Sequence, residues 1–101
     1  MSDWCISVQD ERIVVEGEVV RCSGPAFCHA LDQALPAGLA VDMRDLEIED
    51  GVAMALTIST IRRHLPIRIL YAPQMLAHTL YKIGMLDSER VELVFPRSDR
   101  N

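Results

Sequence analysis

A cluster of carboxylates just before a glycine is the strongest candidate for a functional site in the sequence. Residues 41–56 read VDMRDLEIEDGVAMAL, and five acids fall within nine positions of this stretch: Asp42, Asp45, Glu47, Glu49 and Asp50. Carboxylates at this density could bind a divalent cation, act as acid and base in hydrolysis, or present a charged docking surface. They could also belong to a solvated loop.

Calcium is the first alternative, and the spacing of the acids disfavours it. When Asp45, Glu47 and Glu49 are aligned with loop positions 1, 3 and 5 of an EF-hand, Asp50 falls where the glycine is required. Leu56 then occupies the position of the bidentate glutamate. We therefore expect no metal at this cluster.

The chain carries no motif of another catalytic or cofactor site. The acids have neither an aromatic pocket for a sugar nor a glycine loop for a phosphate. The three histidines lie inside or at the ends of predicted helices: His29, His64 and His78. The three cysteines lack the spacing of a disulfide scaffold or, in CSGPAFCH, of a zinc site, and we expect them to be buried thiols: Cys5, Cys22 and Cys28. We expect a protein that is not an enzyme and holds no cofactor.

Length and charge limit the domain count and the classes of partner. A chain of 101 residues fits one domain, because a second hydrophobic core would leave too little apolar surface for the first. We expect a single domain over residues 1–101, with a folded core at 3–96 and a flexible tail at 97–101. A net charge of -5 and a pI near 5.0 disfavour nucleic acid as a partner. Without an apolar span or a signal-peptide pattern, the chain is expected to be cytoplasmic and not inserted in a membrane.

The elements that must position the acids follow from the hydrophobic periodicity. Alternating apolar residues predict an antiparallel hairpin at 4–8 and 12–20, in which Gly17 marks a bulge or a close approach of the backbone. Helical spacing with start and stop residues predicts helices at 25–35, 51–64 and 72–86. Short apolar runs predict strands at 39–43, 67–71 and 91–95. The order indicates an α/β fold with a mixed, mostly parallel sheet of about five strands, three main helices and an acidic loop at 42–51.

This order, together with three short motifs, resembles a STAS domain, the fold of bacterial anti-sigma factor antagonists. In that family a strand ending in Asp leads, eight residues later, to a second Asp and two hydroxyl residues that open a helix; Asp42 and Asp50 have this separation. VEGEV at 15–19 is similar to the Gly-Glu-Leu of the family's second strand, and LYKIGML at 80–86 is similar to its Leu-x-x-x-Gly-Leu helix end. The resemblance runs from residue 13 to about residue 95.

The resemblance implies a non-enzymatic partner-switching module that docks an anti-sigma factor or a kinase-like protein. In that family, phosphorylation of a Ser or Thr at the helix start ejects the partner, because a phosphate brings negative charge and bulk into the interface. The implied partner-binding residues are Asp42, Asp45, Glu47, Glu49, Asp50, Gly51, Val52 and Ala53. Val52 occupies the phosphoacceptor position and cannot be phosphorylated, so we expect constitutive binding.

Two further functions stay open at this point. The same resemblance fits a cytoplasmic STAS subunit of a phospholipid-transport ATPase complex. A small-ligand-binding or purely scaffolding domain is the other alternative. Trp4 and Cys5 on an edge strand could also allow a dimer by edge pairing.

Overall fold

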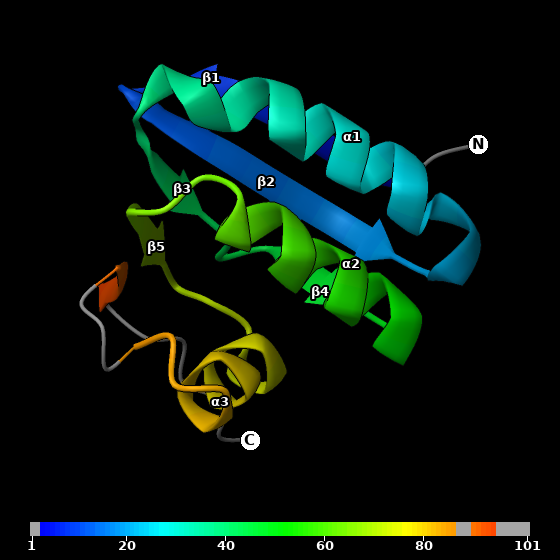
Figure 1. The fold of residues 1–101 in the computed structure, drawn as a ribbon. Coiled ribbons are helices and arrows are strands. Elements are labelled where there is room, and N and C mark those ends of the chain that lie inside the picture. The colour runs from blue at the N-terminus through cyan, green and yellow to red at the C-terminus, as the bar shows by residue number, and fades with distance from the viewer. Residues whose placement is uncertain (1–2, 87–89, 95–101) are drawn as a thin grey trace.

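The computed structural model describes residues 3–86 and 90–94, and within them one sheet carries three α-helices (Figure 1). The strands are β1 (Trp4–Gln9), β2 (Arg12–Val19), β3 (Ala40–Asp42), β4 (Leu46–Ile48), β5 (Ile67–Leu70) and β6 (Val91–Val94). The helices are α1 (Gly24–Ala34), α2 (Gly51–Arg62) and α3 (Gln74–Lys82), with the short 3-10 turns η1 (Arg21–Ser23) and η2 (Leu35–Ala37).

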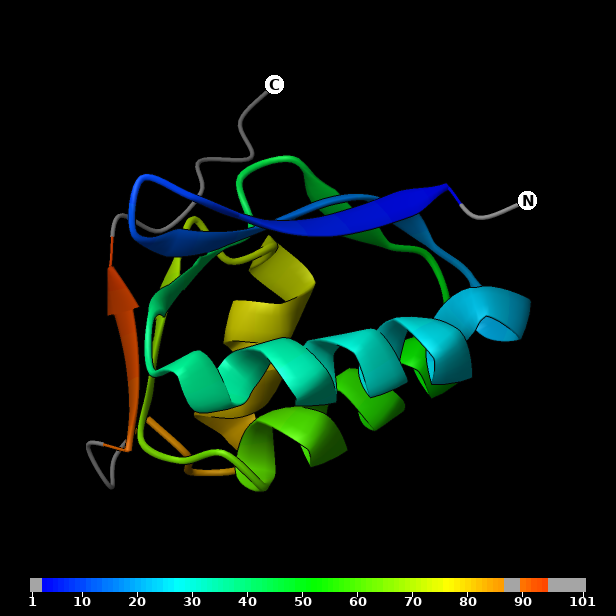
Figure 2. The same cartoon turned by 90° about the horizontal axis from the view of Figure 1, so that it is seen from above.

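The sheet has the strand order β1-β2-β3-β5-β6, with β4 pairing to the far end of β2. β1 and β2 form the antiparallel hairpin, and all the other pairs are parallel. Because the strands after β2 are added in one direction through right-handed crossovers, the helices lie on one face of the sheet, as Figure 2 shows. The predicted α/β class, with its mostly parallel sheet and N-terminal hairpin, is confirmed.

The strand β4 corrects the prediction of a continuous loop at 42–51. Gly17 N–H donates to the Asp45 carbonyl at 2.9 Å, and Glu49 N–H donates to the Val19 carbonyl at 2.8 Å, so the segment between them continues the ladder of β2. Leu46 points into the core while Glu47 is exposed. Strand alternation over only three residues, inside a run of carboxylates, is too short to show in the sequence. The sheet therefore has six strands in the described part of the chain.

A single hydrophobic core fills the space between the sheet and the helices. Its largest side chain that is fully shielded from solvent is Phe27 of α1, against which Trp4 of β1 packs edge-on with the ring centroids 5.5 Å apart. The indole thus belongs to the core side of the hairpin. Gly17 has φ +107°, and a Cβ there would lie 2.0 Å from the Asp3 carbonyl oxygen, so the predicted close approach of the backbone is confirmed.

The predicted helices are present, and their ends differ by a few residues. The α1 helix gives way to η2 before Gly38, whose left-handed φ of 76° turns the chain toward β3. The α3 helix covers 74–82 of the predicted 72–86, and Gly84 has φ 81°. The predicted tail at 97–101 and the end of the core at 95–96 lie outside the described residues. No helix in the described ranges is long and apolar enough to cross a membrane.

Candidate partner-binding site

The fold places the five acids in different surroundings, and Asp42 is the one that is buried. Asp42, the last residue of β3, is only 8% exposed. One carboxylate oxygen lies 3.0 Å from Nη1 of Arg12, and the other accepts a hydrogen bond from the backbone N–H of Arg44 at 2.9 Å. Arg44 in turn stacks over the ring of Tyr71, 4.1 Å from its centroid. These contacts occupy Asp42 at the end of the sheet, and its carboxylate is not exposed to a docking partner.

Asp45 and Glu47 are exposed at and beyond the end of β3. Asp45 borders a polar hollow that also contains Arg12 and Arg44. Glu47 on β4 lies beside Glu18 on β2, since the two are paired in register, and both are exposed. Two like charges side by side on adjacent strands repel each other. Together they make the electrostatic potential at this end of the sheet more negative.

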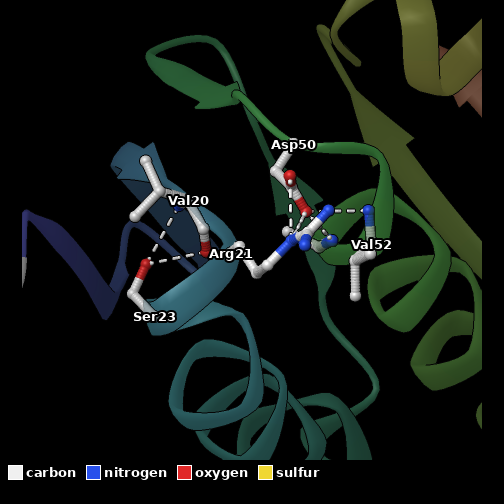
Figure 3. Close-up of polar contacts among 6 residues, drawn as sticks. Val20, Arg21, Ser23, Asp50 and Val52 are labelled. Atoms are coloured by element: carbon white, nitrogen blue, oxygen red, sulfur yellow. Dashed lines mark hydrogen bonds and ion pairs between the residues drawn. The ribbon is translucent and has the colours of Figure 1, made fainter.

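Asp50 caps the N-terminus of α2. Its Oδ2 accepts hydrogen bonds from the backbone N–H groups of Val52 at 2.8 Å and Ala53 at 3.1 Å, and Nε of Arg21 lies 3.4 Å from Oδ1 (Figure 3). The hydrogen bond from Ala53, then that from Val52 and the proximity of Arg21, lower the pKa of this carboxyl below its usual value. An ionised cap at a helix start is the arrangement that the backbone donors and the helix dipole favour.

The three residues after Asp50 have different surroundings. Gly51 is exposed and Val52 is 46% exposed, whereas Ala53 is fully buried. Ala53 packs against Gly24 of α1, where an added Cβ would come within 3.4 Å of the Ala53 Cβ. Ala53 therefore joins two helices and, like Asp42, is not available for direct contact with a partner.

A groove that was not predicted from the sequence begins at the start of α2. It runs between α2 and α3 beside the end of β4 and has a volume of about 470 Å³. Apolar side chains dominate its lining, which comprises Ile48, Glu49, Asp50, Gly51, Met54, Ala55, Ile58, Met75 and Thr79. Met75 is 65% exposed. Met75 lies in the first turn of α3, outside the buried stripe of Leu76 and Leu80, and an apolar residue off the core stripe is the signal in the sequence that could have indicated the groove.

The hydroxyl groups of α2 are not placed as substitutes for a phosphoacceptor. Thr57 is buried and donates to the Ala53 carbonyl at 2.8 Å, and Thr60 is buried and donates to the Leu56 carbonyl at 3.0 Å. Ser59 is exposed, yet it is the ninth of the twelve residues of α2 and lies outside the groove. A hydroxyl at the helix start is absent, because that position is Val52.

The cysteines and histidines form no site in the described part of the chain. Cys28 is buried as expected, but Cys5 and Cys22 are exposed, because they lie on the helix-free side of the edge strand β1 and in η1. His64 hydrogen-bonds to Asp32 of α1, and no group of three or more His, Cys, Asp or Glu side chains among residues 3–86 and 90–94 could hold a metal.

Comparison with known proteins adds no assignment to this geometry: no model of a protein family matches the chain, and no curated protein sequence matches it.

Proposed function

We propose that the chain is a non-enzymatic, cytoplasmic protein-interaction module of the STAS type, similar to anti-sigma factor antagonists, that binds a protein partner in the groove between α2 and α3. The observation that supports this proposal most is the position of the groove. It opens at the start of α2, beside Glu49, Asp50 and Gly51, and these are residues through which the resemblance implies docking.

The chemistry of the groove supports a protein segment as its occupant. Met54, Met75 and Ile58 supply flexible or branched apolar surface, which adapts to the side chains of a docked helix or loop. Glu49 and Asp50 add negative charge at one end. A partner with apolar side chains flanked by Lys or Arg would complement both features.

The absence of a hydroxyl at the helix start supports binding without a phosphorylation switch. Val52 exposes an apolar side chain where the family carries its phosphoacceptor, and the buried hydroxyls of Thr57 and Thr60 already donate to the helix backbone. No kinase can act on Val52. We expect the partner to remain bound when the cell's kinases are active.

Affinity capture from a lysate of the source organism tests the proposal. The wild-type chain should retain a kinase-like or sigma-associated protein, and phosphatase treatment of the lysate should not change the amount. Met75→Gln should lose most of it, while Tyr81→Gln should not, because Tyr81 is 64% exposed on the same helix but outside the groove. Recovery of a membrane transport ATPase instead would assign the chain to such a complex. Recovery of no partner that depends on Met75 would contradict the proposal.

A further inference from the structure

A second hollow lies at the opposite end of α2 and shares no residue with the docking groove. It has a volume of about 410 Å³ and is formed where the parallel strands β3, β5 and β6 begin, below η2 and the loop that follows α2. This volume is within the range of clefts that hold small molecules. We call it the arginine cleft, because Arg68 and Arg90 line it.

The two arginines are brought together by the pairing of β5 with β6. Arg90 directly precedes β6, and its carbonyl accepts a hydrogen bond from Ile67 N–H at 2.8 Å, which holds it beside the start of β5. Arg68 follows Ile67 by one residue. Two guanidinium groups on neighbouring strand starts can bind the several oxygens of one phosphate group, each in a forked geometry.

The arginines of the cleft are only partly neutralised by the carboxylate beside them. Among the described residues, Glu92 is the one carboxylate that lines the cleft, and Nε of Arg68 lies 3.2 Å from its Oε1. Both side chains of this pair are more than half exposed, so the pair is weak and Arg68 can turn toward a ligand at little cost. Among residues 3–86 and 90–94, no ion pair involves Arg90.

The lining of the cleft combines polar and apolar side chains. His64 contributes an imidazole whose Nε2 is engaged by Asp32, so the ring has a fixed orientation. Leu35, Leu39 and Ile67 provide an apolar surface beside the cations. A ligand that matches this lining has a charged head and a short apolar body.

The charge distribution of the whole chain adds to this argument. The chain has a net charge of -5, yet the described residues that line the cleft include two arginines and one carboxylate, and the neighbouring Arg63 is balanced by its ion pair with Asp32. Because salt screens charges beyond about 8 Å, the arginines near the cleft, and not the net charge, determine the local potential. We infer that the arginine cleft binds a phosphate monoester with a small apolar body, a function separate from the docking proposed for the other end of α2.

Titration with phenyl phosphate, followed by amide chemical shifts in NMR spectra, tests the inference. The shifts should concentrate on residues 35–40, 64–68 and 90–92, and inorganic phosphate should cause smaller shifts at the same residues because it lacks the apolar body. Arg90→Gln and Arg68→Gln should each weaken phenyl phosphate binding about tenfold, the effect of one lost charged hydrogen bond. Shifts scattered over the surface would overturn the inference.

Arg62→Gln is the matched control. It removes the same charge from an exposed arginine at the same end of α2, outside the cleft, and should change binding by no more than about twofold, as expected for a screened surface charge. If Arg90→Gln and Arg68→Gln behave like Arg62→Gln, binding reflects general attraction and the inference is wrong.

Vesicle binding distinguishes the two sources of such a ligand. Phosphatidylcholine vesicles with and without phosphatidic acid are floated with the wild-type chain and with Arg90→Gln. Flotation that needs phosphatidic acid and is lost in Arg90→Gln would assign the phosphate to a lipid headgroup. Phenyl phosphate binding without flotation would assign it to a soluble compound. Flotation that persists in Arg90→Gln would contradict a role of the cleft in lipid binding.

Discussion

Asp50 closes the N-terminus of α2 with its own side chain, so its first role is structural. Hydrogen bonds from Ala53 and Val52, with Arg21 close by, lower its pKa below 3.8. Between the folded-state pKa and 3.8, the unfolded chain binds more protons than the folded chain, and the free energy of unfolding therefore rises with pH. This contribution is complete above pH 3.8 and is lost as the pH falls through the lower, folded-state pKa.

The change Asp50→Ala should lower the melting temperature by roughly 4–8 °C at neutral pH, as expected for one lost helix cap in a domain of this size. It should also flatten the loss of stability in acid. Thermal melts followed by circular dichroism over a range of acid pH values measure both effects. Glu49→Ala is the control, since Glu49 is exposed and precedes the cap; an equal loss in this variant would argue against capping.

Gly17 should tolerate no side chain. Its φ of +107° is unfavourable for other residues, and a Cβ would meet the Asp3 carbonyl oxygen at 2.0 Å. We expect Gly17→Ala to lower the free energy of unfolding by about 2–4 kcal/mol, measured by urea unfolding. Gly38→Ala is the comparison, because Gly38 also has positive φ, at +76°, but nothing lies within 4 Å of an added Cβ. Gly38→Ala should lower the free energy of unfolding by about 1 kcal/mol. Equal costs would show that the close approach to Asp3 is unimportant.

Single residues differ in how far the sequence alone could predict their roles. Gly17 was predicted to mark a bulge or a close approach, because a glycine that interrupts a strand pattern is typical of such sites. Asp42 and Ala53 were predicted to contact a partner, and the fold buries both. Their burial depends on Arg12, which is thirty residues away from Asp42 in the chain, and on Gly24 of α1. Pairings of this kind are set by tertiary packing and leave no local pattern.

The helix α2 joins the two ends of the molecule that we assign to binding. Its first turn exposes Val52 beside the docking groove, where a negative charge would imitate phosphorylation in the STAS family. Val52→Glu should fold normally, because a carboxylate in the first turn suits the helix dipole. It should weaken partner binding about tenfold, because it replaces an exposed apolar side chain and places a third carboxylate beside Glu49 and Asp50, whose like charges repel it.

Ser59→Glu is the matched control for this change, since Ser59 is exposed on the same helix and lies outside the groove. Binding of both variants is measured by calorimetry with the captured partner. If Val52→Glu binds as well as Ser59→Glu, the start of α2 is not part of the interface.

Helices and strands with strong hydrophobic periodicity were predicted correctly, whereas the shortest strand was not. The hairpin, the three helices and the strands β3, β5 and β6 were predicted because each has an apolar pattern or clear start and stop residues. The strand β4 was missed because three residues show almost no period. The groove was missed because it is made by the packing of α2 beside α3, which neither helix specifies alone.

On the scale of the whole molecule, acids and bases of neighbouring segments gather at opposite ends of α2. The acids Glu47, Glu49 and Asp50 lie near the start of this helix, and Arg62 and Arg63 lie in and just after its last turn. The helix dipole favours this arrangement. The two binding functions that we propose, a protein partner at the start of α2 and an anionic small molecule near its end, match this arrangement.

Docking of a partner in the groove can be measured by isothermal calorimetry, with the captured partner titrated into the purified wild-type chain, Met75→Gln and Tyr81→Gln. Both side chains are exposed on α3, and only Met75 lines the groove. If the partner docks between α2 and α3, Met75→Gln should weaken binding roughly tenfold or more, as loss of an apolar anchor does, while Tyr81→Gln should bind like the wild type. Equal affinities for the two variants would contradict docking in the groove.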